Sequence, residues 1–331
     1  AAYRDASRNY AYAANFGQRP FAYTAPSGFV ALNTYNLPDS TIKKGNRYMD
    51  ATTYTGTRAT QVVTNAAGFK PDMVWCRGRS LVSQILTTDS VRGVTKQLFP
   101  PLTVAEQTDS TMITSLNSNG FTLGDGSGGP YGNINYNIGG TYVGWQWQAG
   151  QGSTSTNTQG SITSTVSVNT TAGFSIVTYT GVASNTSTVG HGLGVAPSMI
   201  IIKYRDGATS WIVYHRSLGN TSSIMLNSTA ASSSANNFWN STSPTSSVFS
   251  VSYVSGINGD VNFAGRNYIA YCWAEIDGFS KFGSYTGNGS ADGPFVYLGF
   301  RPKFLLIKNS SATGYNWNII DSTINTYNVS N

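Results

Sequence analysis

Three copies of one ten-residue pattern organise this chain of 331 residues. The copies read GFKPDMVWCR at 68–77, GVAPSMIIIK at 194–203 and GFRPKFLLIK at 299–308. An upstream Tyr-Thr-Gly moves with them, since Tyr54, Tyr179 and Tyr285 precede the glycine of each copy by 14, 15 and 14 residues. Two landmarks that keep their spacing in three copies indicate duplication, because chance matches do not move together. The sequence therefore predicts repeats of one structural unit.

Two further segments follow the same register. TYVGWQWQAG at 141–150 matches NYIAYCWAEI at 267–276, and SWIVYHRSLG at 210–219 resembles YNWNIIDSTI at 315–324. Each repeat thus has a Tyr-Thr-Gly opening, a Gly-x-x-Pro segment, a middle containing Trp and, where complete, a closing aromatic strand. The third copy reaches Asn331 without a closing strand. We expect further sequence or another chain to complete it, because an open sheet edge is a liability.

The repeated ten residues predict a strand with a marked start. Glycine permits a tight turn, and the proline that follows opens a strand where no ladder N–H is needed. MVWC, MIII and FLLI are apolar without alternation, which favours central strands covered on both faces. Arg77, Lys203 and Lys308 come next, and we expect each to carry its charge out to water.

The fold class that this pattern predicts is all-β: tandem β-sandwich domains, of jelly-roll or concanavalin-like type, with very little helix. Short strands alternate with Ser, Thr, Asn and Gly clusters along most of the chain. The best helix signal is TTDSVRGVTKQLF at 87–99, where Asp89 or Ser90 could cap a turn or two and Gly93 argues against more. The low-complexity stretch at 150–167 marks a predicted domain boundary.

Composition narrows the class of partner. Charged residues make up 10% and aromatic residues 13%, which indicates an ordered chain with a neutral surface rich in amides and hydroxyls. The net charge of +6 is spread thinly, so we expect no nucleic-acid partner. We expect no membrane insertion, because no apolar run approaches the about 18 residues of a membrane helix. Cys76 and Cys272 each sit in an apolar run and are predicted to be buried thiols rather than a disulfide.

The residues do not predict an enzyme. His191 and His215 lack partners at metal-ligand spacing, and we expect them in a turn and at a strand end. Asp125 lacks a calcium-loop pattern and is expected in a turn, within a glycine-rich connection at 124–132. The 14 acidic residues offer no obvious pair for glycoside cleavage, and no Gly-x-Ser-x-Gly elbow is present. We therefore predict no catalytic residue, metal site or cofactor.

Saccharide is the ligand class that the surface composition favours. Tyr and Trp beside Asn, Ser and Thr hold sugars through stacking and neutral hydrogen bonds. Trp147, Trp211, Trp273 and Trp317 are nevertheless predicted to be core residues, because they recur at repeat positions. The ligand-binding residues therefore stay unassigned, in variable loops.

Two parts of the chain resemble known proteins. NFGQRPFAYTAPSGFVALNTYNLP at 15–38 resembles the final strand and exit of SPRY domains in large structural proteins of marine bacteriophages. GFKPDMVWCRGRS, DSVRG, NGFTLG and YVGWQWQAG resemble the repeat domain of unknown function that follows such SPRY domains. The resemblance covers nearly the whole chain from Asn15, although Gln146 stands where the second repeat has Cys272. The domains expected are a SPRY-like C-terminal end at 1–40, repeat 1 at 41–150, a linker and repeat 2 at 151–276, and an incomplete repeat 3 at 277–331.

The resemblance implies a virion protein without enzymatic activity. The favoured hypothesis is a tail fibre or fibre-like appendage that contacts the host surface. The partners implied are other copies of the chain (a trimer, by analogy with such fibres), other virion proteins and a host-surface glycan. The alternatives are a capsid decoration or capsid fibre protein, and a lectin-like bacterial surface adhesin. Whether the repeats pack together or hang as separate beads is left open by the sequence.

Overall fold

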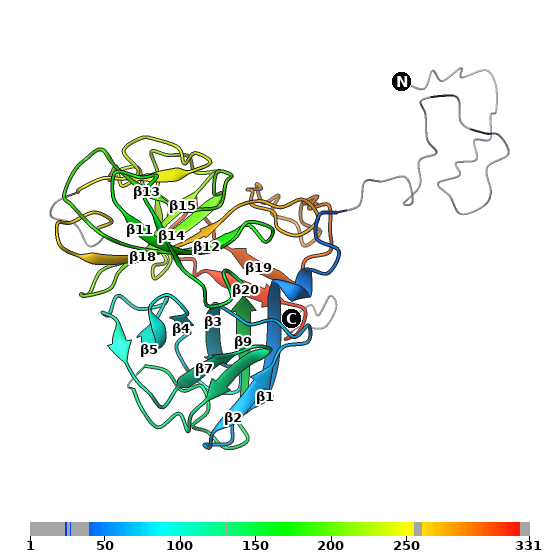
Figure 1. The fold of residues 1–331 in the computed structure, drawn as a ribbon. Coiled ribbons are helices and arrows are strands. Elements are labelled where there is room, and N and C mark those ends of the chain that lie inside the picture. Colours follow the sequence, from blue (N-terminus) through cyan, green and yellow to red (C-terminus); the bar gives the residue numbers. More distant parts are fainter. Residues whose placement is uncertain (1–23, 25–26, 28–39, 130, 255–259, 325–331) are drawn as a thin grey trace, which may run out of the picture.

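The computed structural model describes residues 24, 27, 40–129, 131–254 and 260–324, so the expected SPRY-like end at 1–40 lies almost wholly outside them. The described residues form antiparallel strands and one short 3₁₀ helix, which confirms the all-β prediction (Figure 1). No helix in these ranges is long and apolar enough to cross a membrane. The elements are η2 (Gly45–Arg47), β1 (Met49–Thr55), β2 (Gln61–Thr64), β3 (Met73–Gly78), β4 (Leu86–Asp89), β5 (Gly93–Leu98), β6 (Gln107–Thr108), β7 (Ile113–Asn117), β8 (Gly120–Leu123), β9 (Thr141–Trp147), β10 (Ser155–Asn157), β11 (Ser164–Asn169), β12 (Phe174–Thr180), β13 (Ser187–Gly190), β14 (Met199–Tyr204), β15 (Ile212–His215), β16 (Ile224–Met225), β17 (Val248–Val251), β18 (Asn267–Trp273), β19 (Phe304–Ile307) and β20 (Asn318–Asp321).

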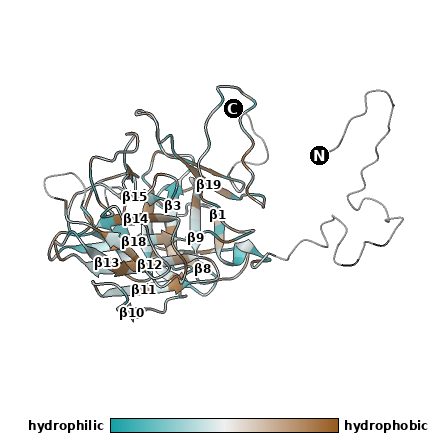
Figure 2. Ribbon diagram, turned by 90° about the horizontal axis from the view of Figure 1, so that it is seen from above, coloured by the Kyte–Doolittle hydropathy of each residue, from teal (hydrophilic) through white to brown (hydrophobic). Residues whose placement is uncertain are grey.

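The first two repeats each build a sandwich of one large and one small sheet. In the first, a sheet in the order β1-β9-β3-β4-β5-β6 packs on a sheet in the order β2-β8-β7. In the second, a sheet in the order β10-β11-β12-β18-β14-β15-β16 packs on the pair β13-β17. The runs β1-β9-β3-β4 and β12-β18-β14-β15 are equivalent, and Figure 2 shows hydrophobic residues along the central strands. We call β9 and β18 the closing strands.

Paired tyrosines lock each closing strand to the opening strand. Tyr54 stacks on Tyr142 with ring centroids 5.3 Å apart, and Tyr179 stacks on Tyr268 at 5.1 Å. The hydroxyl of Tyr54 donates to the carbonyl of Ile134 at 2.8 Å, which satisfies a polar group inside an apolar cluster. The repeated Tyr-Thr-Gly is therefore a structural signature of the sandwich.

The repeated glycines have the backbone that the sequence predicts. Gly68, Gly194 and Gly299 have φ of 69°, 76° and 82°, a left-handed conformation that favours glycine. The strands β3, β14 and β19 begin five residues after each glycine, beyond the proline. The prediction of a strand with a marked start is confirmed in all three repeats.

The large sheets turn their second faces toward one another, and the hydrophobic cluster between them is the shared core of the molecule. It contains Trp75, Trp145 and Trp147 of the first repeat and Ile201, Trp211, Tyr271 and Trp273 of the second. Phe304 and Leu306 of β19 and Ile319 of β20 pack against the same cluster, beside both sandwiches (Figure 1). The three repeats thus pack together around one core and are not separate beads.

Equivalent hydrogen bonds join the repeats in a cyclic order. Asp89 accepts one from the hydroxyl of Tyr271 at 2.7 Å, and Asp321 accepts one from Trp145 Nε1 at 2.7 Å. Asp89 and Asp321 hold the same position, because they pair with the first residues of β3 and β19. Trp145 and Tyr271 are likewise equivalent within β9 and β18. These bonds run from repeat 2 to repeat 1 and from repeat 1 to repeat 3.

A second bond type follows the same order. Trp211 Nε1 of repeat 2 donates to the carbonyl of Leu102 in repeat 1 at 3.0 Å. Trp317 Nε1 of repeat 3 donates to the carbonyl of Met225 in repeat 2 at 2.9 Å. Contacts that repeat head to tail close into a ring when the rotation allows it. The three repeats therefore form a pseudo-threefold arrangement within one chain, which we call the three-repeat ring.

Three sequence expectations are wrong. Residues 87–99 form β4, a turn and β5 rather than a helix, because Gly93 has φ of 100° and the Asp89 carboxylate accepts the N–H groups of Val91 and Arg92 within the turn. Lys203 is fully buried, since its Nζ donates to the carbonyls of Tyr204 and Gly207. The FLLI run of β19 is only half-buried and pairs with β20 alone among the described strands, whereas β3 and β14 are central as expected.

Candidate binding cleft at the repeat junction

A cleft of about 410 Å³ opens where the three repeats meet. Repeat 1 contributes the end of β3 and two loops, repeat 2 the segment after β16, and repeat 3 the β19-β20 pair. The lining residues are Trp75, Arg77, Ser83, Gln84, Ile85, Pro100, Pro101, Leu226, Asn227, Ser228, Thr229, Leu306, Asn316, Trp317 and Ile319. We call this the junction cleft. It exists only because the repeats pack as a ring.

The junction cleft combines one cation with neutral hydrogen-bonding groups. Arg77 is exposed at the end of β3, and no described residue forms an ion pair with its guanidinium. Trp317 is half-buried, and its ring is held by the bond from Nε1 to the Met225 carbonyl. Gln84 and Asn316 add amides. Such a lining can hold a polar ligand by stacking, hydrogen bonds and one ion pair.

General acid-base groups are missing from this lining. None of the described residues around the cleft carries a carboxylate, an imidazole or a thiol. Throughout the described ranges, no group of three or more His, Cys, Asp or Glu residues is placed to hold a metal ion. The groups that do line the cleft include aromatic rings, amides, hydroxyls and one guanidinium.

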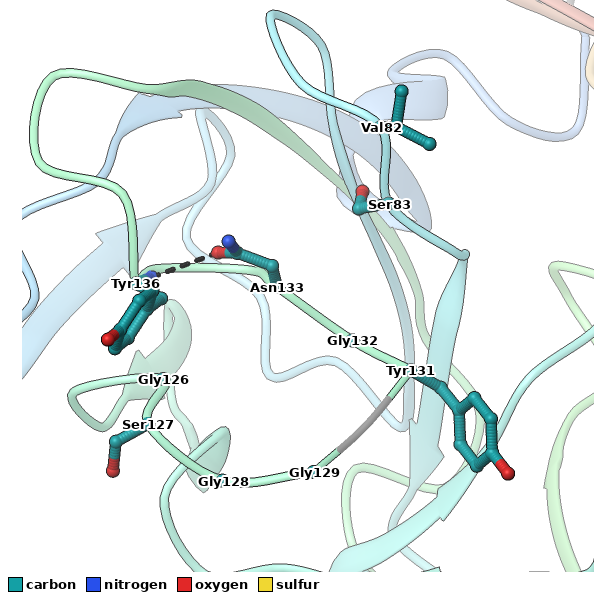
Figure 3. Close-up of a pocket in the computed structure, with 10 residues that line it drawn as sticks. All are labelled: Val82, Ser83, Gly126, Ser127, Gly128, Gly129, Tyr131, Gly132, Asn133 and Tyr136. Atoms are coloured by element: carbon teal, nitrogen blue, oxygen red, sulfur yellow. Dashed lines mark hydrogen bonds between the residues drawn. The ribbon is translucent and has the colours of Figure 1, made fainter.

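A second, smaller pocket of about 260 Å³ lies at the glycine-rich loop of the first sandwich (Figure 3). The Asn133 side chain accepts the Tyr136 N–H at 3.1 Å, and the Arg58 guanidinium lies over the Tyr136 ring. Ser127 and Tyr131 point away from one another, so the polar groups do not converge (Figure 3). Asp125 accepts the Ser127 N–H in a tight turn, as the sequence predicts. This pocket is the weaker candidate.

A buried ionic network holds repeat 1 against repeat 2. Arg92 Nε lies 2.6 Å from the Asp89 carboxylate, and Glu106 bridges Arg92 and Arg205 at 3.1 and 2.8 Å. Burial alone would lower the pKa of Arg92, but the Asp89 carboxylate beside it raises that pKa well above its ordinary value. Burial works against the charge of Glu106, yet the two arginines hold its pKa below the usual range. Each charge in the network is paired, so it fixes repeat orientation.

The other residues singled out in the sequence have structural roles. His191 is buried in a turn, where Nδ1 accepts the Leu193 N–H at 3.1 Å, and His215 is the last residue of β15. Burial lowers the pKa of His191 to about 4. Cys76 and Cys272 are buried free thiols, which confirms that prediction, and burial raises the pKa of Cys76 to about 12.

The four repeat tryptophans belong to the core side of the molecule. Trp147, Trp211 and Trp273 are buried, and Trp317 is half-buried against the shared core while also lining the cleft. Sequence reasoning missed Arg77 as a cleft residue. The one sequence signal is the cation that recurs after each Gly-x-x-Pro strand. It does not single out Arg77, which only the structure shows to be the exposed one of the three.

The fold and the cleft define an all-β repeat protein whose three repeats share one core. The chain belongs to the family described as "Domain of unknown function (DUF7483)", whose family model matches residues 44–331. No curated protein and no solved structure matches the chain.

Proposed function

We propose that this chain is a non-enzymatic structural protein of a bacteriophage virion, a tail fibre or fibre-like appendage that contacts the host surface. The virion setting is supported by the SPRY-like and repeat resemblance of the sequence. The contact with a host surface is supported by the junction cleft. It offers a binding surface that all three repeats build together, with no acid-base pair among its described lining residues.

The ligand class that suits the cleft is a saccharide with an acidic group. Its volume of about 410 Å³ lies within the range of small-molecule sites, which run from about 300 to 1,000 Å³. Amides and hydroxyls match sugar hydroxyls, Trp317 offers an apolar ring, and Arg77 matches a carboxylate in a geometry that favours two parallel hydrogen bonds. Homo-oligomers and other virion proteins are the further partners of this proposal, because fibres display many such sites together.

Binding is tested on an array of neutral and acidic glycans with the intact protein. We expect acidic glycans to bind, and Arg77→Ala and Trp317→Ala each to reduce that binding at least tenfold. Arg79→Ala is the matched control, because Arg79 is an exposed neighbour outside the cleft lining. Binding that survives both cleft substitutions would contradict this site.

The virion role is tested by electron-microscopy reconstruction of the particle from the source of this sequence, with a labelled antibody fragment marking the chain. A rod that leaves the tail supports the appendage. Label on the capsid lattice would replace it with the alternative, a capsid decoration or capsid fibre protein. A chain absent from any particle, and anchored instead to a bacterial surface, would favour the adhesin.

A further inference from the structure

The third repeat has the strand that receives a closing strand but no described closing strand. In the first two repeats, β3 and β14 lie between a closing strand and the next strand along the chain. The equivalent strand β19 pairs with β20 on one side, and no described strand lies on its other side. Its free N–H and C=O groups form an edge that an added strand can pair with.

On the face of β19 that points away from the shared core, side chains are less buried than their equivalents in the first two repeats. Leu305 stands where Val74 and Ile200 stand, and those two are fully buried whereas Leu305 is only partly buried. Tyr285 corresponds to Tyr54 and Tyr179, which stack on closing-strand tyrosines. It is 54% exposed and stacks on no described ring.

The contacts between repeats on the shared-core face of β19 also predict a closing strand in repeat 3. His215 pairs with the first residue of β14, so it stands where Asp89 and Asp321 stand. Each of those aspartates accepts a hydrogen bond from the central aromatic residue of the closing strand of the next repeat, Tyr271 or Trp145. His215 Nδ1 accepts the Ser217 N–H at 3.2 Å, so the neutral ring carries its proton on Nε2, which can donate to the hydroxyl oxygen of a tyrosine. That partner would lie on a closing strand of repeat 3.

We infer that the free edge of β19 binds one further antiparallel strand of the closing type, with the pattern Tyr-x-x-Tyr-x-Trp. The pattern is that of residues 268–273, and residues 142–147 differ from it in having Trp145 at the central position. The first Tyr stacks on Tyr285, and the hydroxyl of the central Tyr accepts from His215 Nε2. The Trp enters the shared core near Phe304, as Trp147 and Trp273 do beside Met73 and Met199. The occupant is a strand outside residues 40–324, and it completes both the third sheet and the ring.

The test appends a copy of residues 266–274 to the full chain after Asn331, through a flexible Gly/Ser linker. Hydrogen exchange is then measured by mass spectrometry over residues 303–308, and the melting temperature is recorded. We expect exchange there to slow at least tenfold and the melting temperature to rise. The matched control carries Ala270→Pro in the copied strand, which removes a ladder donor and should give no protection.

A second comparison distinguishes binding at the proposed site from non-specific binding of the added strand. Tyr271→Leu in the copied strand, or His215→Ala in the chain, should reduce the protection at 303–308 while strand pairing persists. Equal protection by the proline control would overturn the inference, as would no protection by the intact copy, whether fused or added as a free peptide. Protection already present in the unmodified chain, together with sedimentation as a dimer, would also overturn it, because a second copy would then occupy the edge. None of these outcomes depends on glycan binding.

Discussion

The second and third repeats place nearly the same strand in two different surroundings. β14 is central in its sheet and buried on both faces, whereas β19 pairs on one side and is half-buried along its length. Both strands follow a left-handed glycine and a proline, and both send alternate side chains into the shared core. The comparison teaches that the face of the strand toward the shared core packs in both repeats. The opposite face, which lies inside the sandwich, is fully buried only in the repeat that has a described closing strand.

The most damaging change should be at the ring contact of repeat 1. Asp89→Ala removes the nearest carboxylate from the buried Arg92 guanidinium, and we expect a loss of about 3–5 kcal/mol in the free energy of unfolding. The matched change in repeat 3, Asp321→Ala, leaves the Trp145 indole N–H and the N–H groups of Thr323 and Ile324 without their acceptor but unpairs no buried cation, and it should cost about 1–3 kcal/mol. Urea unfolding of both variants measures the difference. Equal losses would mean that the ionic network adds nothing to the ring.

The next largest difference in stability loss should be between equivalent side chains of β14 and β19 that point away from the shared core. Ile200→Ala removes a fully buried side chain from the core of the second sandwich and should cost about 3 kcal/mol. Leu305→Ala at the equivalent position of β19 should cost less, about 1 kcal/mol, because that side chain is only partly buried. Thermal unfolding in parallel compares them. A Leu305→Ala loss as large as that of Ile200→Ala would show that the third sandwich face is already covered.

Acid should then loosen the second repeat through His191. Burial lowers its pKa from 6.5 to about 4, so between these values the unfolded chain binds a proton that the folded chain does not. Stability therefore falls as pH drops from 6.5 to 4, by about 2–3 kcal/mol in all. His191→Asn copies Asn65, which accepts the Gly68 and Phe69 N–H groups at the corresponding turn of repeat 1. Urea midpoints at several pH values should lose this slope in the variant; an unchanged slope would assign it to another group.

The smallest effect should be at the exposed tyrosine of repeat 3. Tyr285→Ser should change stability by no more than about 0.5 kcal/mol, because the side chain is 54% exposed. Tyr179→Ser at the equivalent buried position should cost several times more, since it loses a stacked ring and a bond to the Val261 carbonyl. Differential scanning calorimetry resolves both, and a large Tyr285→Ser effect would contradict the open sandwich face.

Much of the fold could be predicted from the sequence, because repeated segments show directly which strands are structurally equivalent. Fixed spacing between Tyr54 and Gly68 and between Tyr285 and Gly299 identified the repeat, and the apolar runs identified its strands. The two strands within 87–99 could not be distinguished from a short helix, because an aspartate such as Asp89 can cap either a helix or a turn.

The ring and the cleft could not be predicted in the same way. They depend on which repeat meets which, and the bonds between Asp321 and Trp145 or between Trp317 and Met225 join residues that carry no mutual spacing signal. Lys203 shows a similar limit. Its burial depends on the chain folding back so that the Gly207 carbonyl accepts from Nζ, and this burial lowers its pKa to about 8. Arg77 at the equivalent position is exposed instead, although a bend also follows its strand.

The central claim is that the repeats form one cooperative unit around the shared core. It is tested most directly by native-state hydrogen exchange in β14 after a change confined to the first sandwich, Val74→Ala. Val74 is fully buried in the cluster of the first sandwich and is not part of the shared core. We predict that the free energy of opening for residues 199–204 falls by the same amount as the global stability. Unchanged protection in β14, with protection lost only in β3, would contradict the claim and show that the sandwiches unfold independently.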